Sequence, residues 1–176
     1  RFLQPLQLTQ TEASNHRDLA NLANGYLAKD NPMGLPQTTL DEQDVMRWHP
    51  GAEGAGGGLV SNPSDLANWL YHLMNGEVLS QDGLAQMLDS LALQPQDQSV
   101  GYGLGMAHYQ EPNWGDIYGH GGWIPGYVSS LRYYARPNIS IAFQINTDSG
   151  LEYRGQSVVK LIEQRLIHAA TQTITK

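Results

Sequence analysis

One ten-residue segment carries residues whose types could do chemistry. From Tyr118 to Tyr127 the sequence reads Tyr-Gly-His-Gly-Gly-Trp-Ile-Pro-Gly-Tyr. Glycine in a strand often marks a place where a ligand or another backbone comes close, and an imidazole can accept or donate a proton near neutral pH. The segment indicates either a substrate-binding strand edge with His120 as an acid–base group, or a twisted edge strand whose histidine is simply exposed.

The other candidates for chemistry are weaker. Ser157-Val-Val-Lys160 has the spacing of a serine–lysine pair, but chance alone gives about 0.2 such matches in this composition, and the match lies in an amphipathic helical pattern. Asn146 and Asp148 follow the last predicted strand and either face a cleft or cap the C-terminal helix; we favour capping. The six histidines lack the short spacings typical of metal ligands, so we expect no metal site and no cofactor.

The first half of the chain is predicted to be irregular and then helical. Residues 1–60 contain many turn formers and little periodicity, with a short helix expected around 18–24. A helical hairpin is predicted over 61–90. Asn62 is its expected N-cap, and the Asp65 carboxylate is expected to reach back to that cap.

The second half changes from a helical period to the alternation of strands. An antiparallel sheet is predicted over 100–148, followed by an amphipathic C-terminal helix over 151–171 that covers one face of the sheet. The runs expected as strands are 102–109, 116–122, Tyr127–Tyr134 and 139–146. The predicted fold class is therefore α+β.

Composition narrows the function classes. The hydrophobic fraction is 40% and the charged fraction 15%, as in a globular domain. A formal charge of −7 without a Lys/Arg cluster argues against a nucleic-acid partner, and no apolar run approaches the roughly 20 residues of a membrane span. The absence of cysteine excludes disulfides and thiolate metal sites, and it is compatible with both the cytoplasm and the periplasm.

Resemblance to a known family sharpens the reading of the central segment. His120-Gly121-Gly122 in its context resembles the third active-site motif of the β-lactamase-like serine hydrolases (class C β-lactamases, D-alanyl-D-alanine carboxypeptidases and related esterases), where Lys or His precedes a small residue and Gly. Further landmarks are similar to the family's and occur in its order: residues 4–11, 21–26, 56–67 and 101–105. The resemblance covers nearly the whole chain and implies the C-terminal part of a single domain of the β-lactamase/transpeptidase-like fold.

The resemblance also implies a mechanism and the roles of four residues. The family transfers acyl groups through a serine acyl-enzyme. His120 would act in the proton network around the nucleophile, and Gly121 and Gly122 would leave the strand edge open for a substrate lying along it as an added strand. The Trp123 N–H takes the position whose equivalent donates to the oxyanion, and its indole either lines the cleft or packs at the rim.

The family's Ser-x-x-Lys and Tyr/Ser-x-Asn motifs lie upstream of where this chain begins. We therefore expect the chain alone to be inactive, and to bind a missing N-terminal half that carries the nucleophile or else to self-associate. Expected substrates are a peptidoglycan peptide, an ester or a β-lactam; His at position 120, in place of Lys, favours the peptidase-like and esterase-like members. The alternatives are a catalytically dead peptide-binding module and a purely structural domain. A bacterial periplasm or envelope is expected, and the cytoplasm stays open.

Overall fold

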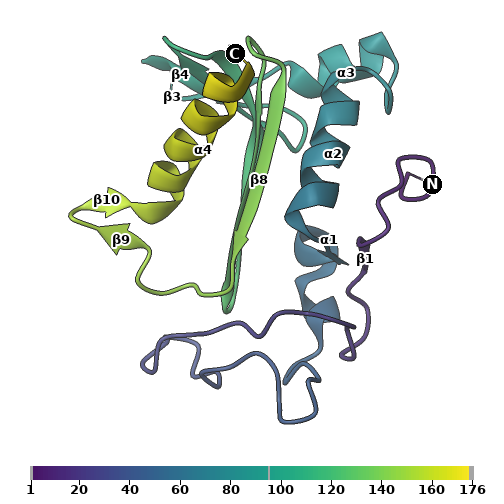
Figure 1. The fold of residues 1–176 in the computed structure, drawn as a ribbon, viewed down its shortest axis with the longest axis vertical. Coiled ribbons are helices and arrows are strands. Elements are labelled where there is room, and N and C mark those ends of the chain that lie inside the picture. Colours follow the sequence, from purple (N-terminus) through teal and green to yellow (C-terminus); the bar gives the residue numbers. More distant parts are fainter. Residues whose placement is uncertain (1, 95, 175–176) are drawn as a thin grey trace.

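The computed structural model describes residues 2–94 and 96–174 and places one antiparallel sheet between two helices (Figure 1). Helix α2 lies on one face of the sheet, and α4 lies on the other. The sheet is a meander of six strands in chain order, each antiparallel to the next. These are β3 (Leu91–Gln94), β4 (Asp97–Tyr102), β5 (Ala107–Glu111), β6 (Gly115–Ile124), β7 (Tyr127–Tyr134) and β8 (Ile139–Ile145). The α+β class predicted from the sequence is confirmed.

Two helices lie in the range predicted as a helical hairpin, and each begins at a capping side chain. Helix α2 (Pro63–Met74) begins after Asn62, whose Oδ1 accepts the Asp65 N–H at 2.8 Å. Helix α3 (Gln81–Leu88) begins after Ser80, whose hydroxyl accepts the N–H of the third residue at 3.1 Å. These caps satisfy N–H groups that have no partner within the helix.

The carboxylate of Asp65 does not reach back to the cap as expected. Its Oδ2 accepts the Gln10 N–H at 2.8 Å and the Thr11 hydroxyl at 2.9 Å. Asp65 is buried, so these two donors replace the water that the carboxylate would otherwise keep. The first turn of α2 thereby holds the N-terminal segment against the helical layer.

Each face of the sheet carries its own core. On the α2 face, Leu70 and Leu73 pack with Tyr133; on the α4 face, Ile167 packs with Tyr134 and Ile117. Neighbouring tyrosines reach opposite cores because successive side chains of a strand alternate between its faces. Burial raises the pKa of Tyr134 to about 12, helped by the nearby Glu163 carboxylate.

The C-terminal helix begins later than predicted. Residues 152–157 form a two-stranded hairpin of β9 (Glu152–Tyr153) and β10 (Gln156–Ser157), and α4 runs from Val158 to Ile174. Its turn needs positive φ at both central residues, which Arg154 (51°) and Gly155 (76°) adopt. Helix α4 is fastened to β7 through Glu163, which accepts the Ser130 hydroxyl and pairs with Arg132 at 3.2 Å.

Three further expectations need correction. The sheet starts at Leu91 rather than at residue 100, and residues 102–109 span the turn between β4 and β5 rather than one strand. No helix forms around 18–24, where backbone carbonyls accept from distant side chains instead: Ala23 from the Tyr127 hydroxyl and Asn24 from the Asn146 amide.

The N-terminal sixty residues are largely irregular. Their only regular elements among the described residues are β1 (Glu12–Ala13), which pairs with β2 (Leu59–Val60), the 3-10 helix Pro50–Glu53 and the one-turn α1 (Gly54–Gly57). Within the described parts of the chain, no helix combines the length and apolar character needed to cross a bilayer.

Candidate active-site wall

The predicted segment Tyr118–Tyr127 runs from the middle of β6 through the turn to the first residue of β7, and one edge of β6 is unpaired from His120 onward. Strand β6 pairs with β7 along its length, from Ile117↔Tyr134 to Ile124↔Tyr127. Its pairing with β5 stops at Gly119↔Ala107. Within the described chain, residues 120–124 therefore have a strand neighbour on one side only. The backbone groups of their other edge can pair with an added strand.

His120 lies at the start of this open edge and makes two hydrogen bonds through its ring. Its Nε2 lies 2.8 Å from the Tyr102 hydroxyl, and its Nδ1 contacts the carbonyl of Gly121. A carbonyl can only accept, so Nδ1 carries the hydrogen in this geometry. In the neutral ring Nε2 is then the acceptor, and Tyr102 donates to it.

The structure explains the glycines at positions 119, 121 and 122 differently. A Cβ on Gly119 would lie 2.0 Å from the Leu131 carbonyl oxygen, so the pairing of β6 with β7 requires glycine there. On Gly121, a Cβ would meet nothing closer than 3.8 Å. A Cβ on Gly122 would meet only the end of a flexible side chain, Ser129 Oγ, at 2.3 Å. The fold thus demands glycine at 119 but not at 121, where the absence of a side chain leaves the exposed edge clear.

A cavity of about 800 Å³ adjoins the end of this edge. Gly122, Trp123 and Ile124 of β6 contribute to one wall, with residues of β7 and β8. The opposite wall comes from the N-terminal segment and α1. Trp123 is 59% exposed. Gly122 and Trp123 thus line the cavity, whereas His120 and Gly121 lie outside its lining on the exposed edge.

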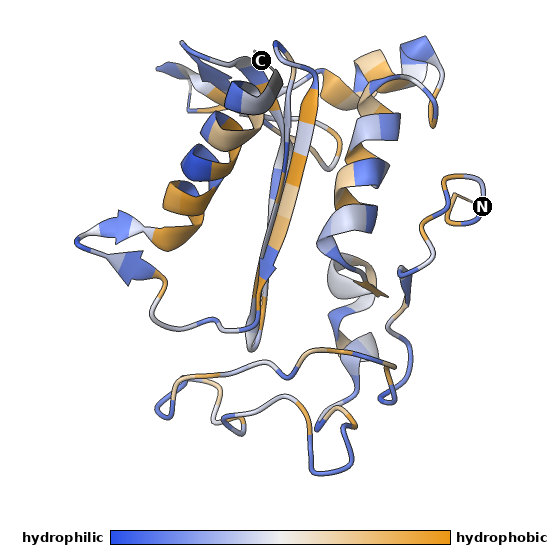
Figure 2. Ribbon diagram, viewed as in Figure 1, coloured by the Kyte–Doolittle hydropathy of each residue, from blue (hydrophilic) through white to orange (hydrophobic). Residues whose placement is uncertain are grey.

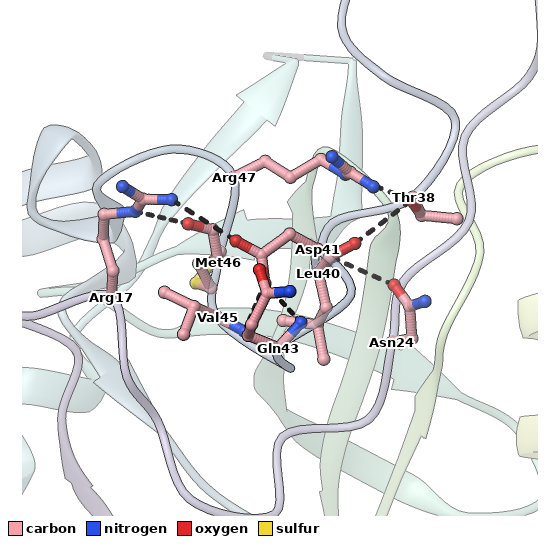
Figure 3. A network of polar contacts seen from close by, with 9 residues as sticks. All are labelled: Arg17, Asn24, Thr38, Leu40, Asp41, Gln43, Val45, Met46 and Arg47. Carbon is pink, nitrogen blue, oxygen red and sulfur yellow. Dashed lines mark hydrogen bonds and ion pairs between the residues drawn. The ribbon is translucent and has the colours of Figure 1, made fainter.

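The irregular N-terminal wall is held by a polar network (Figure 3). Asp41 Oδ1 accepts the Gln43 and Val45 N–H groups at 3.0 Å, while Arg17 donates to the Met46 carbonyl and lies 4.0 Å from Asp41. The hydrogen bond from Val45 is the main reason that the pKa of Asp41 is lowered. The loop therefore has a defined shape without regular structure.

Asn146 and Asp148 do not cap the C-terminal helix, contrary to the favoured expectation. Asn146 lines the cavity and donates to the Asn24 carbonyl at 2.9 Å. Asp148 accepts the Gly126 N–H at 3.0 Å. Each side chain thus bonds to another loop or turn and not to the C-terminal helix, since α4 begins only at Val158.

The Ser-x-x-Lys match has a structural role. The Ser157 hydroxyl accepts the Lys160 N–H at 3.4 Å in the first turn of α4. This is the usual contact of a helix-capping serine. Ser157 also lies on a different element from β6 and outside the cavity lining.

Sequence reasoning missed the side-chain partners of two histidines, His120 and His108. The contact of Tyr102 with His120 has no local sequence signal, because the two residues lie on different strands. His108 forms a second chain of contacts, with Ser90 Oγ at 3.0 Å from Nδ1 and Asp116 Oδ1 at 2.8 Å from Nε2. His108 is 15% exposed on its side chain and stacks on Tyr118. These contacts join the segment after α3 to β5 and β6, so His108 has a structural role.

The described residues contain no group of three or more His, Asp or Glu side chains placed to hold a metal ion. The arrangement that remains is an exposed histidine at an open strand edge, followed by two glycines and a cavity. Such an edge can hold an extended substrate, and its backbone N–H groups can stabilise negative charge that develops on a substrate oxygen.

Comparison with known proteins identifies the family. The beta-lactamase family model matches residues 1–161. The chain belongs to the β-lactamase family. This confirms the family predicted from the His-Gly-Gly segment and its ordered landmarks.

Solved structures of similar fold include amidases and a penicillin-binding protein. A D-stereospecific amidohydrolase from Streptomyces sp. is 25% identical, with a TM-score of 0.69 over 84% of this chain and 42% of that one. D-amino acid amidase from Ochrobactrum anthropi SV3 is 24% identical, with a TM-score of 0.76 over 98% and 52%. A penicillin binding protein from Bacillus halodurans is 22% identical, with a TM-score of 0.62 over 84% and 43%. The chain thus spans about half the length of the structures it matches.

A matched pair of glycine substitutions separates the needs of the fold from those of the edge. Gly119→Ala forces a Cβ onto the Leu131 carbonyl, and we expect it to lower the free energy of unfolding by about 1–3 kcal/mol. Gly121→Ala enters open space and is expected to change it by less than about 0.5 kcal/mol. Urea unfolding of the two variants beside the parent chain measures both; equal effects would contradict the different reasons given for the two glycines.

Proposed function

We propose that this chain forms the His-Gly-Gly wall of a serine hydrolase active site, in a protein that cleaves an amide or ester through a serine acyl-enzyme. The observation that carries the proposal is the open edge of β6. It begins at His120, it is kept clear at Gly121, and it ends beside the cavity at Trp123. Membership of the β-lactamase family supports the reaction class.

In the proposed reaction the substrate lies along the open edge of β6 as an added strand. A serine from outside this chain attacks its carbonyl carbon, and negative charge develops on the carbonyl oxygen. The Trp123 N–H donates to that oxygen; a donor of this kind contributes about 3 kcal/mol to stabilising the transition state. His120 holds or relays the proton that the serine gives up, and this proton passes to the amine or alcohol that leaves as the acyl-enzyme forms. Water then attacks the acyl-enzyme, which releases the acid and returns a proton to the serine.

Amides and peptides of D-amino acids are the substrate class we favour. Two of the similar folds belong to enzymes whose names specify D-amino acid amides or D-stereospecific amide hydrolysis, and a third is a penicillin binding protein. Esters and β-lactams are the other substrates of the proposal. A peptidoglycan peptide would place the enzyme in a bacterial envelope.

The nucleophile is proposed to come from a further part of the protein that packs on this chain. Strand β8 pairs only with β7 among the described residues, and Figure 2 shows it as largely hydrophobic. A groove of about 360 Å³ lies along β8 between α2 and α4. The Ser140 hydroxyl, on this strand, is buried and has no hydrogen-bond partner within the described chain. An unpaired edge with a buried polar group without a partner favours a further strand or a second copy there.

Covalent labelling tests the proposal. The full-length protein and this chain are each treated with a fluorophosphonate, and the intact masses are compared under denaturing conditions. We expect an adduct on the full-length protein and an unchanged 19.4 kDa mass for the chain alone. An adduct on the chain alone would overturn the assignment of the serine to another segment. Absence of an adduct on both would favour the alternative, a catalytically dead peptide-binding module.

Substitution of the histidine tests its role in acylation. In the full-length protein we expect His120→Ala to slow acylation by roughly a hundredfold or more, as for loss of an acid–base group. Its stability should change by less than about 0.5 kcal/mol, because the side chain is exposed. His16→Ala, at another exposed histidine, is the matched control. Equal acylation rates for His120→Ala and the parent would remove the proposed role.

The isolated chain is expected to associate through β8. Light scattering should give a mass above the 19.4 kDa of one copy. Ala142→Lys places a charge in the groove beside the free edge and should favour the monomer, since lysine on an edge strand opposes further pairing. Gln86→Lys, on the exposed face of α3, controls for the added charge. A wild-type chain that is monomeric at all concentrations would contradict the expectation.

A further inference from the structure

We propose that Tyr102 is a positioning residue for His120: its hydroxyl donates to Nε2, which favours the tautomer with hydrogen on Nδ1 and fixes the orientation of the ring. The proposal rests on the role of His120 in the proposed function and deepens it. It starts from one contact, the 2.8 Å approach of the Tyr102 hydroxyl to His120 Nε2. The two rings also meet edge to face, with centroids 5.8 Å apart and planes at 77°.

The backbone on both sides of Tyr102 is held closely enough to place its side chain. Tyr102 is the last residue of β4 and pairs with Leu91 and Ala107. The next residue, Gly103, passes so close to α3 that an added Cβ would lie 2.3 Å from the Met87 carbonyl oxygen. That carbonyl accepts the N–H of Leu104 at 3.0 Å. The turn after β4 therefore packs on the end of α3, and this contact fixes the position of the Tyr102 backbone.

The ring of His120 needs such a partner because its surroundings give it little packing. It is exposed and lies where β5 no longer flanks β6. His108, by contrast, is nearly buried and is held by two polar side chains and a stacked tyrosine. His120 bonds to one backbone group, the adjacent Gly121 carbonyl, and to one side chain, that of Tyr102. The bond to Tyr102 therefore orients the His120 ring.

The two hydrogen bonds of the His120 ring favour the same position for its ring hydrogen. The Gly121 carbonyl can only accept, so it requires hydrogen on Nδ1. The Tyr102 hydroxyl could accept or donate, but a phenol is the stronger donor, so its contact favours a lone pair on Nε2. Both contacts thus favour the same neutral tautomer. The basic nitrogen of His120 is therefore Nε2, held at the Tyr102 hydroxyl. Without that hydroxyl, the His120 ring would keep only its hydrogen bond to the carbonyl of the adjacent Gly121.

The tautomer of His120 can be measured in this chain without any enzymatic activity. Long-range ¹H–¹⁵N correlation spectra at alkaline pH distinguish hydrogen on Nδ1 from hydrogen on Nε2, and His120→Gln assigns the signal by its loss. We expect the Nδ1–H form to dominate in the parent chain. Tyr102→Phe keeps the exposed ring and should raise the ratio of the Nε2–H to the Nδ1–H form several-fold. An unchanged ratio in Tyr102→Phe would overturn the proposal.

Tyr109→Phe is the matched control, since it removes a hydroxyl from the same sheet at a ring that contacts Arg132 instead. It should leave the His120 tautomer as in the parent. A change of equal size in Tyr109→Phe would show a general effect on the sheet and would count against a specific role for Tyr102.

Kinetics in the full-length protein give a second, independent measurement. A ring displaced by a fraction of an ångström to one ångström can cost up to about a hundredfold in rate. We expect Tyr102→Phe to lower kcat by about 10- to 100-fold, with KM changed by less than about twofold. If Tyr102→Phe leaves kcat unchanged while His120→Ala lowers it, the positioning role is overturned and the proposed function stands. If His120→Ala itself has no effect, the proposed function fails, and the tautomer spectra still decide whether Tyr102 orients His120.

Discussion

The unequal length of two neighbouring strands governs the rest of the site. Strand β6 continues for five residues beyond the last pair it makes with β5, at Gly119↔Ala107, while β7 supports it throughout. Backbone groups left without a neighbour must find water, a ligand or another chain. The same feature leaves His120 exposed, clears space at Gly121 and exposes Trp123. Because β5 stops pairing with β6 at Gly119, β6 has an open edge on which a substrate can lie.

The wall opposite this edge is built without regular structure. Side chains take the place of a hydrogen-bond ladder there: Asp65 holds the N-terminal segment to α2, and Asp41 closes a loop on its own backbone. Thr39, fully buried, bonds to Gly25 and to the Tyr127 hydroxyl, and so joins this layer to the end of the sheet. Buried polar groups that are fully paired can define a loop as firmly as a helix.

Local signals predicted the parts of the fold that depend on local physics. Asn62 caps α2 because a short polar side chain can reach the N–H groups of the next turn. The alternation along Ile139–Ile145 predicts a strand because successive side chains of a strand point to opposite faces. The strand expected over 102–109 was wrong because the chain turns after Tyr102: the Gly103 N–H bonds to the Met106 carbonyl, and Gly105 has a positive φ of 72°. The helix expected around 18–24 was wrong because contacts of Ala23 and Asn24 with residues far along the chain outweighed a weak local preference.

By itself, the sequence determined the α+β class, the family and the segment that holds the histidine and its glycines. Each of these depends on residue types at short spacing and on their order along the chain. The tertiary structure alone decided which edge of β6 is open, that Tyr102 meets His120, and that Asn146 lines the cavity rather than capping a helix. These depend on where neighbouring strands end and on contacts between residues far apart in sequence. No local pattern encodes them, because the partner is chosen by packing of the whole sheet.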